Sequence, residues 1–199
     1  MAEPWPAPVT LRGQHVVLVP LAQSHCAQLQ QAAALGDLHR LWYTLVPAPE
    51  DMAAEIDRRL DLRERGEMLP FATCLPDGTA IGMTTYMNID AVNKRLEIGS
   101  TWLGRAAQKS PVNTEAKRLM LAHAFDDLDC IAVEFRTHFM NRQSRAAIER
   151  LGAKLDGILR AHMRLADGSL RDTVVYSITA PEWPAVRANL DWLLTQPRP

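Results

Sequence analysis

Hydrophobic positions recur with two periods along the chain, and these periods separate the expected helices from the expected strands. In residues 49–65, Met52, Ile56 and Leu60 recur every four positions among charged residues, which is typical of a helix with one face on a core. Residues 131–137 alternate instead and are rich in strand-forming residues. The two patterns predict helices over 24–35, 49–65, 115–128, 142–151 and 183–194, and strands over 14–19, 71–75, 80–89, 95–103, 131–137, 157–164 and 171–178.

Turn residues mark where these elements begin and end. Asp77-Gly78 and Asp167-Gly168 each stand between two expected strands, and they predict antiparallel hairpins because Asp-Gly pairs tolerate positive φ angles. Asn141 and Ser24 are placed to cap helices, and Gly152 is placed to end one. Strands that first form a meander and later alternate with helices favour an α/β (α+β) fold, with helices on the faces of a mixed sheet, over a sandwich or a bundle.

Composition adds limits on size and partners. The chain has 199 residues, of which 47% are hydrophobic and 23% are charged, as in an ordinary globular protein. Residues 1–9 and 196–199 are rich in proline, which cannot join β-ladders, so we expect flexible tails around one domain over residues 10–195. A formal net charge of -1 provides no overall field that would attract nucleic acid or a membrane surface.

Cysteine usage and the first residues indicate where the protein resides. Cys26, Cys74 and Cys130 are far apart and form no CxxC pair, so neither a disulfide framework nor a zinc site is expected. The N-terminus carries an acid and prolines where a secretory signal needs a basic start and an apolar core. Residues 16–36 lack formal charges, but Pro20 and several glutamines argue against a membrane span. We therefore expect a cytoplasmic protein.

The segment that follows the strand over 95–103 is the most informative part of the chain. It carries small polar residues and leads into the helix over 115–128. The first amides of a helix have no partner inside the helix and carry partial positive charge, so such a junction can hold a pyrophosphate. An ordinary capped helix explains the same pattern, and the junction alone does not decide between the two.

Four sequence pieces are informative together: VLVPL at 17–21, LEIGSTWL at 96–103, NTEAK at 113–117 and NRQSRAAIERLGA at 141–153. In their order and spacing they resemble the GNAT superfamily of N-acetyltransferases. The last piece is the most specific, because its asparagine, the serine three residues later and the Glu-Arg-Leu-Gly-Ala helix end are similar to the RimJ/RimL-like branch. That branch contains acetyltransferases of protein N-termini and related amines. The resemblance covers residues 14–178.

The resemblance implies a GNAT-like fold and a reaction. The fold has a mixed, mostly antiparallel central sheet with helices on both faces. The reaction moves an acetyl group directly from acetyl-CoA to a primary amine and needs no metal. The amine belongs to a peptide N-terminus or to a small molecule such as a polyamine, an amino acid or an antibiotic, and the sequence does not separate these. A homodimer is expected from the resemblance alone.

The CoA-binding turn departs from the family pattern. Gln108 is present, whereas Pro111 and Asn113 replace two small residues, so one amide donor is lost and bulk is added near the phosphates. Asn113 and Thr114 can compensate with side-chain hydrogen bonds, and Lys109 can screen the pyrophosphate, although an exposed loop lysine is more often only solvated. The resemblance implies a CoA site formed by Trp102, Leu103, Gln108, Lys109, Ser110, Val112, Asn113, Thr114, Asn141, Ser144 and Ile148.

Glu97 and Ser144 are the expected catalytic residues. Glu97 lies in an alternating strand, and the resemblance implies that it accepts the amine proton directly or through water; a solvated strand carboxylate is the alternative. The resemblance places Ser144 near the cofactor sulfur, where its hydroxyl can donate to the leaving thiolate. Ile148 stands where many GNAT members have a tyrosine, which makes the serine the natural substitute. Otherwise Ser144 is a second helix cap.

The resemblance also implies that the strand over 95–103 splays from the strand over 131–137, leaving its backbone to pair with the pantetheine arm. Gly99 fits a bulge there, whose amide would bind the thioester oxygen as it gains charge, although relief at a sheet edge explains a glycine equally well. The acceptor is expected between residues 38–46 and the last hairpin. Trp42, Tyr43, Arg160, His162 and Asp172 either line this cleft or lie on the surface.

Three other interpretations are weaker. His123 and Asp127 form the HxxxD pattern of unrelated acyltransferases, but helical spacing explains it. Cys130 begins an expected buried strand without a neighbouring histidine, as core cysteines do, rather than carrying an acyl group. The altered CoA turn leaves open a non-catalytic acyl-CoA-binding or protein-interaction module, against which the retained catalytic residues argue.

Overall fold

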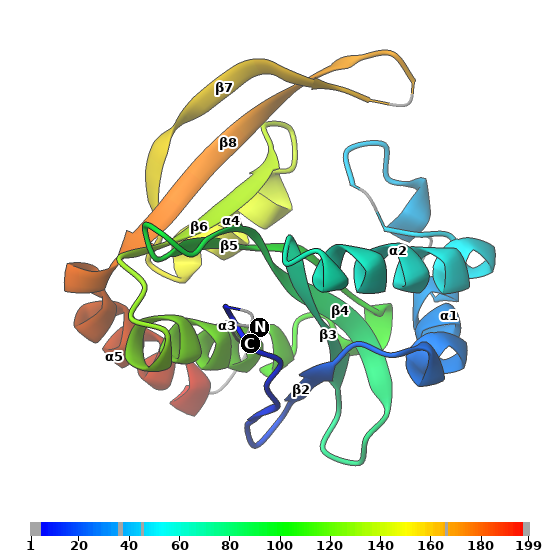
Figure 1. The fold of residues 1–199 in the computed structure, drawn as a ribbon, viewed down its shortest axis with the longest axis horizontal. Coiled ribbons are helices and arrows are strands. Elements are labelled where there is room, and N and C mark those ends of the chain that lie inside the picture. Colours follow the sequence, from blue (N-terminus) through cyan, green and yellow to red (C-terminus); the bar gives the residue numbers. More distant parts are fainter. Residues whose placement is uncertain (1–4, 36–37, 45, 166, 197–199) are drawn as a thin grey trace.

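The computed structural model describes residues 5–35, 38–44, 46–165 and 167–196. Within these residues, eight strands form one sheet in the order β1-β2-β3-β4-β5-β6-β8-β7 (Figure 1). Neighbouring strands are antiparallel except β5 and β6, which are parallel. The strands are β1 (Leu11–Arg12), β2 (Val17–Pro20), β3 (Met68–Cys74), β4 (Ala80–Asp90), β5 (Arg95–Leu103), β6 (Ala132–His138), β7 (Lys154–Arg164) and β8 (Leu170–Thr179).

Helices cover both faces of this sheet (Figure 1). They are α1 (Cys26–Ala34), α2 (Met52–Glu64), α3 (Val112–Ala122), α4 (Arg142–Arg150) and α5 (Trp183–Thr195). Because side chains alternate along β3, Phe71 joins the core cluster that contains Leu121 of α3, whereas Ala72 joins the cluster that contains Ile56 of α2. Short 3-10 turns are formed by Gln23–His25, Leu38–Arg40, Pro49–Asp51, Arg105–Ala107 and Ala180–Glu182, and a π-helical turn by His123–Asp127.

The predicted elements are all present, with bounds that differ by a few residues. The strand over 95–103 matches β5 residue for residue. Asn141 caps α4 as predicted, since its side chain accepts the amide of Ser144. The prediction that Ser24 caps α1 is wrong: Ser24 lies in a preceding 3-10 turn, and His25 is the N-cap. The sequence does not predict β1, because two residues carry no period.

The parallel pair β5–β6 is short, and this creates an opening in the sheet. Its register runs over three pairs and ends at Glu97↔Glu134. Beyond this point, the register between β4 and β5 shifts because Thr84 alone faces two residues of β5, and Ser100 there has a φ of 48°. The bulge expected near Gly99 is therefore present, and the left-handed residue is the one that follows the glycine.

Glu115 of α3 fastens the start of the sheet to the helix layer. Its buried carboxylate accepts the backbone amides of Gln14, His15 and Val16 at 2.9, 2.6 and 2.9 Å. These contacts join parts of the chain that lie about a hundred residues apart. Just before them, residues 5–9 of the expected tail lie against the domain, with Trp5 packed on the core.

We expect Glu115→Gln to lower the free energy of unfolding by about 2–3 kcal/mol, because an amide cannot accept three N–H groups as a carboxylate does, and hydrogen bonds to charged groups contribute about 1.5–3 kcal/mol. Urea unfolding at pH 7 measures the change. Glu64→Gln, at the exposed end of α2, is the matched control and should shift the value by less than about 0.5 kcal/mol. Equal stability of the two variants would contradict the fastening role of Glu115.

Candidate active site

A cleft of about 440 Å³ occupies the opening between β5 and β6. Lys117 and Asn113 line it from α3, on one face of the sheet, whereas Arg136 and His138 line it from β6 on the face that carries Glu97. The cleft therefore passes through the sheet between the diverging strands and connects the two faces. Such a passage lets two substrates approach one reacting point from opposite sides.

The loop before α3 forms one mouth of the cleft. Gln108 donates its side-chain amide to the carbonyl of Leu103 at 3.0 Å, which ties the loop to the end of β5. The Ser110 hydroxyl donates to the Ala107 carbonyl at 2.6 Å. Pro111 is the N-cap of α3, with a φ of -62° that suits a helix start. The proline thus begins the helix that carries Asn113 to the cleft, and its missing amide interrupts no helical hydrogen bond.

The start of α4 forms the opposite wall. The Asn141 side chain accepts the backbone amide of Ser144 at 3.0 Å, which fixes the first turn of the helix. Ser144 and Asn141 both line the cleft, and Ile148 continues the wall one turn later as a buried side chain. Ser144 therefore brings a hydroxyl group to this wall, next to the polar side chains of Asn141 and Gln143.

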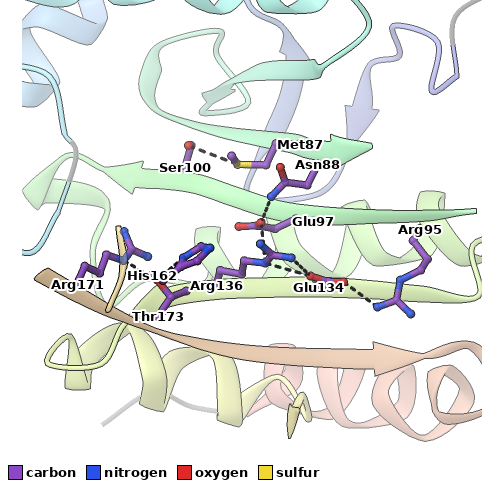
Figure 2. Close-up of polar contacts among 10 residues, drawn as sticks. All are labelled: Met87, Asn88, Arg95, Glu97, Ser100, Glu134, Arg136, His162, Arg171 and Thr173. Atoms are coloured by element: carbon purple, nitrogen blue, oxygen red, sulfur yellow. Dashed lines mark hydrogen bonds and ion pairs between the residues drawn. The ribbon is translucent and has the colours of Figure 1, made fainter. Parts of the chain in front are cut away.

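Glu97 is a buried carboxylate at the point where β5 and β6 part (Figure 2). Its Oε2 accepts the Asn88 side-chain amide at 2.6 Å and lies 3.6 Å from Nε of Arg136. Burial raises the pKa of Glu97, and the bond from Asn88 and the charge of Arg136 offset only part of this rise. A Cβ at Gly99 would lie 2.7 Å from Oε1, so a larger residue there would force this carboxylate to move.

Lys117 places a buried amine on the other face. Its Nζ donates to the hydroxyls of Thr84 and Thr101 at 2.8 and 2.6 Å. Its side chain makes no ion pair within the described part of the chain, and burial alone lowers the pKa to about 7. Near neutral pH the amine is thus partly uncharged. Because Thr101 is one of the two β5 residues at the bulge, the Lys117 bonds also hold the bulged segment in place.

The structure brings most of the predicted site residues together. Ser144, Tyr43, Trp102, Leu103, Gln108, Lys109, Ser110, Asn113, Asn141 and Ile148 all line the cleft. Glu97, Val112, Thr114, Trp42 and His162 do not line it directly. Val112 and Thr114 are buried in the first turn of α3, and Thr114 accepts a bond from Arg150. Trp42 packs edge-on against His138, and His162 contacts Thr173 at 3.1 Å.

The cleft residues that the sequence does not predict include Lys117, Arg136, His138 and Arg171. Lys117 belongs to the NTEAK segment, and its position one and a half turns after the loop could have placed it on the same helix face as Asn113. The other three stand at ends or on polar faces of strands. Nothing in their local pattern distinguishes them from solvated surface charges.

The weaker chemical interpretations gain no support from the geometry. Nδ1 of His123 lies 2.8 Å from Oδ2 of Asp127 within the π-helical turn, as an (i, i+4) pair, and neither residue lines the cleft. Burial raises the pKa of the Cys130 thiol to about 11, which makes it a poor nucleophile. No three His, Cys, Asp or Glu side chains that the structure describes gather as a metal site, and no described helix has the length and apolar character of a membrane span.

Comparisons with known proteins agree with this geometry. A sequence model described as "Acetyltransferase (GNAT) domain" matches residues 15–154. "Putative ribosomal N-acetyltransferase YdaF" from Bacillus subtilis (strain 168) is 33% identical over 112 residues, which are 56% of this chain and 60% of that protein. The matched region thus spans less than two thirds of the relative's length.

Solved structures extend the similarity to nearly the whole chain. A GCN5-related N-acetyltransferase from Brucella melitensis aligns with a TM-score of 0.85 and 33% identity, covering 96% of this chain and 87% of that one. Mycobacterium smegmatis RimJ, in complex with CoA-disulfide, aligns with a TM-score of 0.77 and 25% identity, covering 97% of each chain.

The buried amine of Lys117 makes the stability of the protein depend on pH. Its pKa is lowered on folding, so between pH 7 and pH 9 the unfolded chain binds the proton that the native state has lost, and stability rises with pH. Relative to Lys117→Met, the free energy of unfolding of the wild type should increase by about 2 kcal/mol between these two pH values. Urea unfolding at both values measures this. A difference between the two proteins that does not change with pH would show that the amine is not buried in this way.

Proposed function

Because the chain belongs to the acetyltransferase (GNAT) domain family and is an acyltransferase enzyme, we propose that it moves an acetyl group from acetyl-CoA directly to the primary amine of a protein N-terminus. The observation that carries this proposal is the cleft through the sheet. It opens on one face at the helix start of α3 and on the other face beside Glu97.

The side of the cleft formed by α3 and α4 suits acetyl-CoA. The free backbone edge of β5 beyond Glu97 can pair with the amides of the pantetheine arm, as an added strand would. The amide end of α3, with Lys109, Ser110 and Asn113, can hold the pyrophosphate. Pro111 leaves this helix start intact, which favours binding over the degenerate turn that the sequence leaves open.

The chemistry then divides between two side chains. Glu97, whose pKa is raised, accepts a proton from the acceptor ammonium directly or through water. The neutral amine nitrogen attacks the thioester carbonyl carbon, and an amide of the β5 bulge donates to the oxygen as it gains negative charge. The C–S bond breaks as the amide bond forms, and the Ser144 hydroxyl donates its proton to the departing thiolate while the proton that the attacking nitrogen loses returns to Ser144 directly or through water.

The names of two relatives favour a protein acceptor. YdaF carries the description "Putative ribosomal N-acetyltransferase". RimJ, a solved structure at 25% identity, carries the name of the branch that the sequence resembles, which contains acetyltransferases of protein N-termini. We therefore put a ribosomal protein N-terminus ahead of a small-molecule amine. The cytoplasmic location and the homodimer stay predictions.

Two measurements test this function in order. Calorimetric titration with acetyl-CoA and with CoA should show micromolar binding with about one site per chain, as expected for a pocket of this kind. Acetyl transfer is then measured by mass spectrometry on synthetic N-terminal peptides of ribosomal proteins, with spermidine as the small-molecule comparison. Absence of CoA binding would favour the interaction module, and transfer to spermidine alone would favour a small-molecule acceptor.

Glu97→Gln should lower kcat/KM for the amine by about 100-fold or more, since general base catalysis contributes about 10²–10⁴-fold. In the wild type, kcat/KM should rise with pH through the raised pKa of Glu97, because only the carboxylate accepts a proton, and the variant should lack this rise. Acetyl-CoA affinity should stay unchanged in both proteins. Glu64→Gln is the surface control, and equal pH profiles for wild type and Glu97→Gln would contradict the role of Glu97.

Ser144→Ala should lower kcat by about 10-fold or more while acetyl-CoA affinity is retained, because the thiolate loses its proton donor. Ser144→Thr keeps a hydroxyl at the same place on α4 and should retain most of the rate. Steady-state kinetics at saturating acetyl-CoA compare the two variants. If both behave alike, the hydroxyl is not the donor, and Ser144 serves only the start of the helix.

A further inference from the structure

Arg171 places a positive charge at the cleft without a matching acid. It lies near the start of β8, is half-buried and lines the cleft. Its Nε donates to Oγ1 of Thr173 at 3.0 Å, and within the described ranges no carboxylate oxygen lies within 4.0 Å of its guanidinium. Burial lowers the pKa of Arg171, and the charge of Glu97 offsets part of this shift.

The neighbouring acids already have their own cations. Glu134 is bonded by Arg95 and Arg136, at 2.7 and 2.8 Å. Asp172, the residue after Arg171, is bonded by Arg160 at 2.6 Å and by the backbone amide of Ala161 at 2.8 Å. The local ion pairs are therefore complete without Arg171. Its guanidinium retains donors for a ligand, because a guanidinium carries five N–H groups.

His138 adds a second donor at the same place. Its Nδ1 accepts the backbone amide of Met140 at 3.0 Å, so the neutral ring carries its hydrogen on Nε2. The side chain is 5% exposed, and Nε2 is buried without a hydrogen-bond partner in the described part of the chain. Burial and the charge of Arg171 lower the pKa of His138, while Asp172 opposes this. A buried donor without a partner is costly, which indicates that a ligand supplies the acceptor.

The two donors lie side by side on the Glu97 face of the sheet. His138 on β6 stands opposite Thr173 on β8 in the strand register, and Thr173 is the residue that Arg171 contacts. Figure 2 shows Arg171, Thr173 and His162 grouped on the side of the sheet to which Glu97 points. The CoA loop before α3 belongs to the opposite side of the passage.

We propose that Arg171 and His138 form a binding site for a carboxylate carried by the acceptor amine. This inference rests on the proposed acetyl transfer and names its substrate class. A planar guanidinium receives both oxygens of a carboxylate, and the Nε2–H of His138 can donate to one of them. The carboxylate is held by these donors while the amine of the same molecule reaches Glu97. Its source is either the α-carboxylate of a free amino acid or an acidic side chain near a peptide N-terminus.

Matched acceptor pairs test the site and distinguish the two sources. One pair is serine and serinamide. Two further pairs are C-terminally amidated peptides that differ by Glu or Gln, at the second residue in one pair and at the third residue in the other. At saturating acetyl-CoA, the carboxylate member of one pair should have a kcat/KM about 10- to 100-fold above its neutral partner, the range expected for charge-assisted hydrogen bonds. Equal values within every pair would overturn the proposal.

Variants separate recognition of the carboxylate from support of the fold. Arg171→Gln should lower kcat/KM for the carboxylate member of the favoured pair far more than for its neutral partner, which removes the preference within that pair. His138→Met should weaken the preference, and His138→Gln, which restores an N–H donor, should recover part of it. Arg164→Gln, an exposed arginine near the tip of the same hairpin, is the matched control and should keep the preference. A fall in kcat/KM that is equal for both members would mean that Arg171 only alters the pKa of Glu97 or supports the fold. This result would overturn the proposal.

A binding measurement keeps this test separate from the proposed function. The CoA-saturated protein is titrated by calorimetry with the same pairs. Tighter binding of one carboxylate member, lost in Arg171→Gln, would support the site even if no amine is acetylated. Equal affinities within each pair would overturn it even if acetyl transfer is observed.

Discussion

The early end of the β5–β6 pairing is the constraint on which the rest of the site depends. The only parallel pair that the structure describes ends after three residue pairs, at Glu97↔Glu134. Past this point, a bulge with Ser100 at a φ of 48° alters the course of β5, while β6 stays paired with β8 as far as His138. An edge of backbone is thereby exposed inside a sheet, where the interior groups of a sheet are normally all paired. The cleft, its two mouths and the position of Glu97 all follow from this separation.

The two faces of the opening carry different electrostatic arrangements. On the α3 face, Lys117 is buried beside two hydroxyls, and burial lowers its pKa to about 7. On the other face, burial raises the pKa of Glu97 despite the nearby charge of Arg136. Each group is thus shifted toward its neutral form, as burial in a low-dielectric site requires. This division fits a passage in which the acyl donor and the amine meet from opposite sides.

Much of the fold could be predicted from the sequence, because local signals carry it. The period-two pattern predicts β5 residue for residue, and Asn141 correctly predicts the start of α4. Ser24 misleads because His25 takes the cap position instead. The effect of Pro111 also differs from the expectation: as the N-cap of α3 it begins the helix, where the sequence suggests only a lost donor. A polar residue near a helix start therefore does not by itself establish which position is the cap.

The candidate site is less accessible to such analysis. Arg171 and His138 lie on β8 and β6, and their association depends on a strand register that joins residues more than thirty positions apart. The isolation of Arg171 becomes visible only when the partners of Glu134 and Asp172 are known. Burial of Lys117 likewise depends on Thr84 from β4 and Thr101 from β5. Tertiary contacts create these properties, and the local sequence pattern does not contain them.

A crystal structure of the protein with bound CoA tests the central claim most directly. The account predicts that the pantetheine arm lies between the diverging ends of β5 and β6, hydrogen-bonded to the backbone of residues 99–103. The pyrophosphate should lie at the start of α3, with the sulfur on the way to Glu97. CoA bound elsewhere, or a gap between β5 and β6 that closes when CoA binds outside it, would contradict the account.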